Sequence, residues 1–138
     1  MFNARRNDPA KFTAGTWVEI FDARWKIARA GNPEYEQALE DSGYRRTDDT
    51  TKKQRALYTA IAEGVLKDWE DVVDQNGEAI PYTTDNCVEV LLENPDLVGE
   101  LLREANTLAN FRREDQQAQA KKPKPFKDGS KSGKSDAA

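Results

Sequence analysis

One stretch, residues 66–111, constrains the fold of this chain more than any other part of the sequence. It contains a strong turn signal at Asp74–Gly77, because Asn and Gly both tolerate positive φ angles. Thr83 or Thr84 can then cap a helix. Asn94–Asp96 ends that helix and starts another, with a capping residue, a proline at the first helical position and an acidic residue. The stretch therefore predicts the end of one helix, a loop that carries a turn, and two helices in series.

Upstream of this stretch, residues 16–29 predict a β-hairpin that turns at Asp22-Ala23. A two-residue loop at this position pairs Ile20 with Trp25. The register collects on one face the apolar side chains of Val18, Ile20, Trp25 and Ile27. Trp17 then points to the opposite face. Because an isolated hairpin is only marginally stable in water, we expect the apolar face to pack on helices.

Three further segments carry start signals or apolar spacing typical of helices. A short helix begins at Asn32–Glu34 and runs to about Asp41. A longer helix is predicted from about Thr51 to Asp68, with an apolar stripe at every fourth residue and Gly64 inside it. The last helix is predicted from about Pro95 to Gln117. Together with the hairpin residues, the helical segments are expected to supply to the core Leu57, Ile61, Val65 and Trp69, and the helix after Tyr82 is expected to supply Leu91.

The pattern as a whole predicts an α+β fold that is mostly helical, with an N-terminal β-hairpin packed on a bundle of about four helices. We expect one folded domain over residues 15–119, preceded by a flexible N-terminus over residues 1–14. Residues 120–138 are expected to form a flexible basic tail, because this part is rich in Pro, Gly, Ser and Lys and has no apolar period.

Charge is distributed unevenly between the predicted domain and the tail. The whole chain has a net charge of −4, and residues 121–138 carry six Lys and two Asp, so residues 1–120 carry −8. An acidic domain is a poor match for nucleic acid, because phosphate contacts require a basic face. No apolar run approaches the roughly 20 residues that a bilayer span requires, and the N-terminus lacks the apolar region of a secretory signal. We therefore expect no nucleic acid, no membrane and a cytoplasmic location.

The sequence offers little for catalysis. His is absent, and Cys87 is the only cysteine, next to a helix start where a thiolate is favoured but equally suited to a small core residue. Gly129–Ser135 has three residues between its glycines instead of the four of a phosphate-binding loop. In a calcium-loop register through Asp74–Gly77, the first and twelfth ligand positions lack an acidic residue. We expect no cofactor, no metal and no enzymatic activity, although a hydrolase that uses paired carboxylates stays open.

Five short segments, in this order along the chain, resemble a known family. They are Gly31–Tyr35, Lys67–Val72, Asp74–Asn86, Leu91–Leu97 and Ala105–Phe111. Over about residues 15–122 the chain is similar to the tail assembly chaperones of long-tailed, siphovirus-type bacteriophages. It departs from that family at the first turn, where relatives often have Asp-Gly and this chain has Asp22-Ala23.

The resemblance implies a late viral protein that acts in the host cell cytoplasm and is absent from the mature virion. Such chaperones bind the tape measure protein and keep it soluble until tail tube subunits assemble around it. In many relatives a ribosomal frameshift near the end of the frame makes a longer form that recruits the tail tube protein; here the resemblance places the divergence within residues 121–134. The alternative from a different class is a structural head–tail joining or tail-completion protein of the virion.

The last predicted helix carries two apolar edges, and one domain of this size is expected to use only one of them in its core. The other edge is then available for a client helix or for self-association. With the outer face of the hairpin, this surface defines the expected partner-binding residues, Trp17, Val98, Leu102, Leu108 and Phe111.

Overall fold

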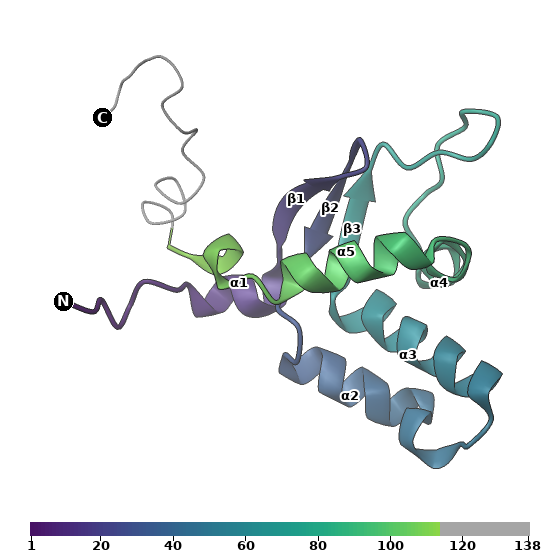
Figure 1. Ribbon diagram of the computed structural model, residues 1–138, viewed down its shortest axis with the longest axis horizontal. Coiled ribbons are helices and arrows are strands. Elements are labelled where there is room, and N and C mark those ends of the chain that lie inside the picture. Colours follow the sequence, from purple (N-terminus) through teal and green to yellow (C-terminus); the bar gives the residue numbers. More distant parts are fainter. Residues whose placement is uncertain (114–138) are drawn as a thin grey trace.

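The computed structural model describes residues 1–113 as a three-stranded antiparallel sheet with helices against one of its faces (Figure 1). The elements in chain order are α1 (Pro9–Ala14), β1 (Thr16–Ile20), β2 (Ala23–Ile27), α2 (Pro33–Ser42), η1 (Tyr44–Arg46), α3 (Thr50–Gly64), β3 (Leu66–Glu70), α4 (Thr84–Glu93), α5 (Pro95–Ala105) and η2 (Leu108–Phe111). The prediction of a mostly helical α+β fold with an N-terminal hairpin is confirmed. The expected domain end at residue 119 and the basic tail over residues 120–138 lie outside the described residues.

The hairpin forms, but its turn lies one residue earlier than predicted. Phe21 and Asp22 occupy the two turn positions with φ angles of 51° and 63°, and Ile20 pairs with Ala23 rather than with Trp25. Each residue of β1 therefore faces a partner two positions from the predicted one. Because side chains alternate with a period of two, this shift leaves the buried face of the hairpin unchanged.

The long predicted helix ends at Gly64, and its last predicted turn is the strand β3. Trp69 pairs with Trp25 of β2, and a bulge at Lys26/Ile27 shifts the register farther along the strand. Pairing with β3 satisfies the backbone N–H and C=O groups on the second edge of β2. If residues 66–70 continued the helix instead, these groups of β2 would have no partner strand. The apolar stripe through Val65 and Trp69 fits either structure locally, so only this tertiary pairing decides between them.

The last helix is also shorter than predicted, since α5 ends at Ala105. Its final carbonyls accept hydrogen bonds from polar side chains: Asn106 Nδ2 donates to Leu102 O at 2.9 Å, and Thr107 Oγ1 donates to Arg103 O at 2.8 Å. These side-chain bonds compete with continuation of the helix. The chain then turns through η2.

The short helix at residues 9–14 and the two residues before it contact the far end of the described chain, and the expectation of a flexible segment over residues 1–14 stays a prediction. Asp8 caps α1, and its N–H donates to Phe111 O at 2.7 Å. Asn7 forms a β-bridge with Arg112, and the ring of Phe12 packs edge-on against the ring of Phe111 at 5.9 Å. These contacts come from the far end of the described chain and could not be seen as a local pattern.

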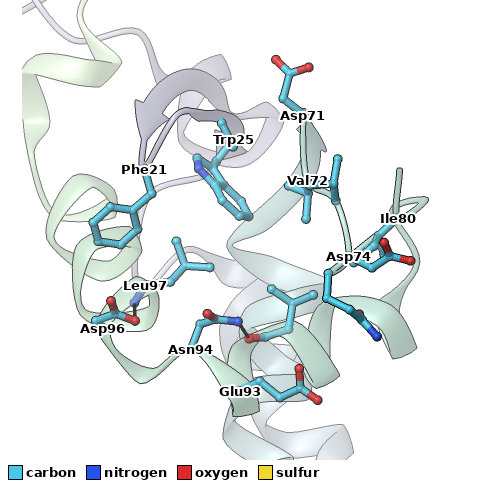
Figure 2. A pocket seen from close by; sticks show the side chains of 14 residues that line it. Phe21, Trp25, Asp71, Val72, Asp74, Ile80, Glu93, Asn94, Asp96 and Leu97 are labelled. Carbon is cyan, nitrogen blue, oxygen red and sulfur yellow. Dashed lines mark hydrogen bonds between the residues drawn. The ribbon is translucent and has the colours of Figure 1, made fainter. Parts of the chain in front are cut away.

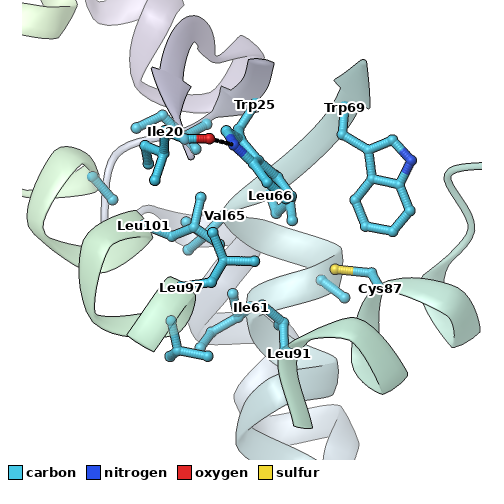
Figure 3. Packing of buried hydrophobic residues seen from close by; sticks show 14 of the residues in the cluster. Ile20, Trp25, Ile61, Val65, Leu66, Trp69, Cys87, Leu91, Leu97 and Leu101 are labelled. Carbon is cyan, nitrogen blue, oxygen red and sulfur yellow. Dashed lines mark hydrogen bonds between the residues drawn. The ribbon is translucent and has the colours of Figure 1, made fainter. Parts of the chain in front are cut away.

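The hydrophobic core lies between one face of the sheet and helices α3, α4 and α5 (Figure 3). It includes eight of the nine core residues expected from the sequence, which are Val18, Ile20, Trp25, Ile27, Ile61, Val65, Trp69 and Leu91. Leu57, the ninth, is only half-buried, since it lies between the main core and a smaller cluster under α2. Full burial of a Leu, Ile or Phe side chain contributes about 1.5–3 kcal/mol, so this core dominates the stability.

Helix α2 crosses α3 at Gly64, where the two backbones approach closely. A Cβ atom placed on Gly64 would lie 2.4 Å from Tyr35 Cα and 2.6 Å from Tyr35 N. The crossing is fixed by Asn32, which is 2% exposed and caps α2 by accepting from Tyr35 N at 3.0 Å. The Asn32 amide also donates to Gly64 O at 2.8 Å, so one side chain satisfies the start of α2 and the end of α3 together.

We predict that Gly64→Ala destabilises the protein by about 1–3 kcal/mol, because the added methyl group overlaps backbone that cannot move alone. Gly99→Ala is the matched control, since Gly99 is also helical and has no atom within 4 Å of its added Cβ. The control should gain about 0.5–1 kcal/mol from helix propensity. Urea unfolding of both variants measures the difference; equal stability of the two would show that α2 is not held at this crossing.

Candidate functional site: an apolar pocket with an acidic rim

The loop between β3 and α4 is held to the core by two aromatic side chains. The Trp69 indole donates to Ile80 O at 2.7 Å, and its ring packs edge-on against Trp25 at 5.9 Å and Tyr82 at 5.2 Å. The Tyr82 hydroxyl donates to Ala62 O at 2.6 Å and contacts Leu66 O. The loop ends are therefore fixed to α3 and β3.

Within the loop, the predicted turn at residues 74–77 forms. Asp74 Oδ1 accepts from Asn76 N at 2.8 Å and from Glu78 N at 3.0 Å, and Gly77 has a φ angle of 80°. An Asp side chain that binds its own loop in this way is typical of turns. The carboxylate of Asp74 thus holds the loop in shape.

A pocket of about 480 Å³ opens beside this loop (Figure 2). Three segments far apart in the sequence build it: the tip of the hairpin, the loop after β3, and the junction of α4 with α5. Its apolar lining consists of Phe21, Ala23, Trp25, Val72, Val73, Ile80, Val90 and Leu97. A concave site of this size, lined by both apolar and polar groups, can accept a side chain of a partner.

Four carboxylates stand around this apolar lining, on Asp71, Asp74, Glu93 and Asp96. No Lys or Arg lines the pocket, and in residues 1–113 none of the four forms a salt bridge. In the same part of the chain, no group of three or more His, Cys, Asp or Glu is placed to hold a metal ion. Within residues 1–113, the pocket therefore combines apolar side chains with carboxylates that no salt bridge compensates.

Phe21 at the pocket edge has an unfavourable backbone and an exposed ring. Its φ angle is 51°, a region that bulky side chains rarely adopt, and its exposure is 61%. The ring thus contributes little to the core while the backbone conformation costs stability. Because strained conformations are concentrated at functional sites, Phe21 is a candidate residue for contact with a partner.

The residues predicted to bind a partner do not form one surface. Val98 and Phe111 are buried, at 8% and 0% exposure, so the second edge of α5 and the end of η2 belong largely to the core. Leu102 is half-buried against that core, and Leu108 is partly exposed on η2. Trp17 is half-buried on the outer face of the hairpin, under the guanidinium of Arg24 at 4.8 Å.

Cys87 is a core residue rather than a reactive thiol. It is fully buried on α4, and burial raises the pKa of its thiol from 9.0 to about 12. Near neutral pH the side chain is therefore protonated and inaccessible. Of the two interpretations of this residue, the structure supports the small core side chain.

Comparison with known families gives one match. A model of the family described as YdaY prophage protein matches residues 26–122. The chain belongs to this family. It is thus a phage-derived protein. The matched region includes the end of β2, the pocket loop and helices α2 to α5. No curated protein and no solved structure matches the chain at a significant level. No helix within residues 1–113 of this YdaY-family protein has the length and apolar character to cross a membrane.

We predict that Trp69→Ala lowers the free energy of unfolding by about 3–5 kcal/mol, because it removes a buried ring and the hydrogen bond to Ile80. Trp17→Ala is the control, since Trp17 lies on the outer face of the hairpin. Thermal and urea unfolding compare the two variants. A similar small loss in both would mean that the Trp69 ring is not a support of the core.

A second prediction concerns alkaline pH. The unfolded chain releases the Cys87 proton near pH 9, whereas the folded chain retains it because its pKa is about 12. The unfolded state therefore binds fewer protons in this window, and stability falls as pH rises. Cys87→Ala should reduce the slope between about pH 8.5 and 9.5, where Tyr82 stays mostly protonated in the unfolded chain as well, because its ordinary pKa is 10.0. The free energy of unfolding is measured by urea unfolding at each pH. If its slope against pH is the same in Cys87→Ala, a group other than the Cys87 thiol causes the loss of stability.

Proposed function

We propose that this prophage protein is a tail assembly chaperone, which binds the tape measure protein in the host cytoplasm and keeps it soluble until the tail tube assembles. Membership of a prophage family supports a phage role, and the five segments that resemble tail assembly chaperones support the finer assignment. The client is a long protein whose apolar segments need reversible cover before assembly. A chaperone of this kind needs an accessible apolar site on a soluble body.

The observation that carries the proposal is the exposed Phe21 ring beside the apolar pocket. A folded domain gains nothing from placing Phe at a φ angle of 51°, where Asn or Gly fits without strain. Its ring extends the apolar surface of the pocket toward solvent. The proposed role of Phe21 is to contact an apolar side chain of the client.

Three of the five segments that carry the family resemblance also lie at or beside this pocket. Asp74–Asn86 supplies the loop, Leu91–Leu97 supplies the α4–α5 junction, and Lys67–Val72 supplies Trp69, which holds the loop in place. These segments are separate in the sequence and adjacent in space. Such convergence is expected of a binding site, although core packing alone would also bring some of them together.

The acidic rim suits the same role. A client segment bound through apolar contacts exposes further apolar surface, which promotes aggregation of the complex. Negative charges around the site keep such a complex soluble through mutual repulsion. The rim also favours client segments in which Lys or Arg flanks the apolar side chain.

The test is capture of the tape measure protein of the same prophage when both proteins are made together. Phe21→Asn should abolish capture, yet the variant should be at least as stable as the wild type because Asn is favoured in this turn. Leu108→Asn is the matched control: it also removes an exposed apolar side chain, but from η2. It should retain capture.

Two outcomes would contradict the proposal. Loss of capture in Leu108→Asn but not in Phe21→Asn would move the client site to η2. Stable presence of the chain in purified particles, without capture of the tape measure protein, would favour a structural joining or completion protein of the virion.

A further inference from the structure

The end of the molecule opposite the pocket has the complementary chemistry. Residues 1–6, here named the N-terminal knob, expose two large apolar side chains: Met1 fully and Phe2 at 73%. The guanidinium of Arg6 lies 4.8 Å from the centre of the Phe2 ring. Arg5, the residue before Arg6, is exposed. The knob is thus an apolar tip between positive charges.

The knob is held in place by the end of the described chain. Arg113 N donates to Arg6 O at 2.8 Å, and Arg113 Nε donates to Arg5 O at 2.6 Å. Arg112 Nε donates to Asn7 Oδ1 at 2.9 Å. The four arginines of this end form no salt bridge with a carboxylate in residues 1–113. Within the described residues, the arginines of this end thus have no carboxylate partner, just as the rim carboxylates have no cationic partner.

The knob cannot enter the pocket of its own chain. Helix α5 separates the two, with its start at the pocket and its end followed by η2 at the knob (Figure 1). Eleven helical residues span about 16 Å. Phe2 is four residues from the anchored Arg6, and four extended residues reach at most about 14 Å. A second copy is required to bring these two surfaces together.

We propose that this protein self-associates head to tail, with the N-terminal knob of one copy seated in the acidic-rimmed pocket of the next. Phe2 enters the apolar interior, and Arg5 and Arg6 face the carboxylates of Asp71 and Asp96. Charge complementarity carries the proposal, because the pocket lacks every cation and the knob lacks every anion.

The contact joins two different surfaces, so each copy keeps one free knob and one free pocket. Such a heterologous contact continues into a ring or a filament unless it is capped. A copy seated in the pocket also covers the proposed client site. A client then competes with self-association, and occupied pockets hide their apolar lining until a client arrives.

The test uses the full chain in sedimentation velocity over a wide concentration range. The wild type should grow in mass with concentration and return to monomer as NaCl is raised from about 0.05 to 0.5 M, because the charges of the rim and the knob are exposed. The knob variant carries Phe2→Ser, Arg5→Gln and Arg6→Gln. It should associate at least about tenfold more weakly than the wild type.

The pocket variant carries Asp71→Asn, Glu93→Gln and Asp96→Asn, which removes three rim charges and leaves Asp74 to hold the loop. Like the knob variant, it should associate at least about tenfold more weakly than the wild type. Its matched control removes three charges from other exposed carboxylates, in Asp41→Asn, Asp48→Asn and Glu63→Gln. This control should associate like the wild type, which separates the rim from total charge.

The decisive experiment mixes the knob variant with the pocket variant. One intact knob and one intact pocket remain in the mixture, so the two should form a dimer of one copy each and nothing larger. Failure of the mixture to dimerise, or a wild type that stays monomeric throughout, would overturn the proposal. A third outcome would also overturn the proposal: the knob variant still associates, but a chain with Lys122→Gln, Lys124→Gln and Phe126→Ser does not. The basic tail, rather than the knob, would then occupy the pocket.

These outcomes are independent of the proposed chaperone function. The knob variant keeps an intact pocket and should still capture the tape measure protein. Loss of self-association with capture retained supports the head-to-tail contact alone, and capture lost only in Phe21→Asn concerns the client site alone.

Discussion

The hydrogen bond from the Trp69 indole to the Ile80 carbonyl is the constraint on which the functional surface depends. The segment between β3 and α4 has no helix or strand of its own, apart from one isolated bridge between Val73 and Ala79. Trp69 fixes it at one point and Tyr82 fixes it at another, through the carbonyl of Ala62. The Trp69 ring packs against both Tyr82 and Trp25, so the sheet, α3 and the loop meet in one aromatic cluster. Without this cluster the pocket would lose one wall.

The hairpin turn beside this pocket is locally unfavourable. Phe21 has a positive φ angle, which a bulky side chain rarely adopts. This conformation costs free energy in the isolated chain. The core can sustain that cost because buried side chains such as Ile61, Leu91 and Leu101 contribute about 1.5–3 kcal/mol each. Strain of this kind persists where the surrounding structure determines the conformation.

Local signals allowed part of this structure to be predicted from the sequence. The caps at Asn32 and Thr83 act within three residues, so the starts of α2 and α4 are visible in the sequence itself. The buried face of the hairpin follows from alternation and survives the displaced turn. These features depend on interactions between residues close in the sequence, so they can be predicted without knowledge of the fold.

The remaining features depend on contacts between distant residues. The strand β3 has an apolar spacing that a helix also satisfies, and the free edge of β2 decides between them. Phe111 is buried because α1 covers it, and no local pattern in either segment indicates that pairing. The pocket was missed for the same reason, since Phe21, Val72 and Leu97 come from three segments. The turn itself was misplaced because Phe is an unusual residue at a positive φ angle.

The β-bridge between Asn7 and Arg112 joins the two ends of the described chain, and this has a practical consequence for how the protein is handled. An affinity tag added before Met1 starts beside Phe2, at the surface proposed to contact a neighbouring copy. Arg113, the last described residue, lies on the same side of the molecule, because it donates hydrogen bonds to the carbonyls of Arg5 and Arg6. A label attached within an exposed part of α2, such as at Glu36, is separated from both this side and the pocket. Labels for solution measurements are therefore best placed on α2.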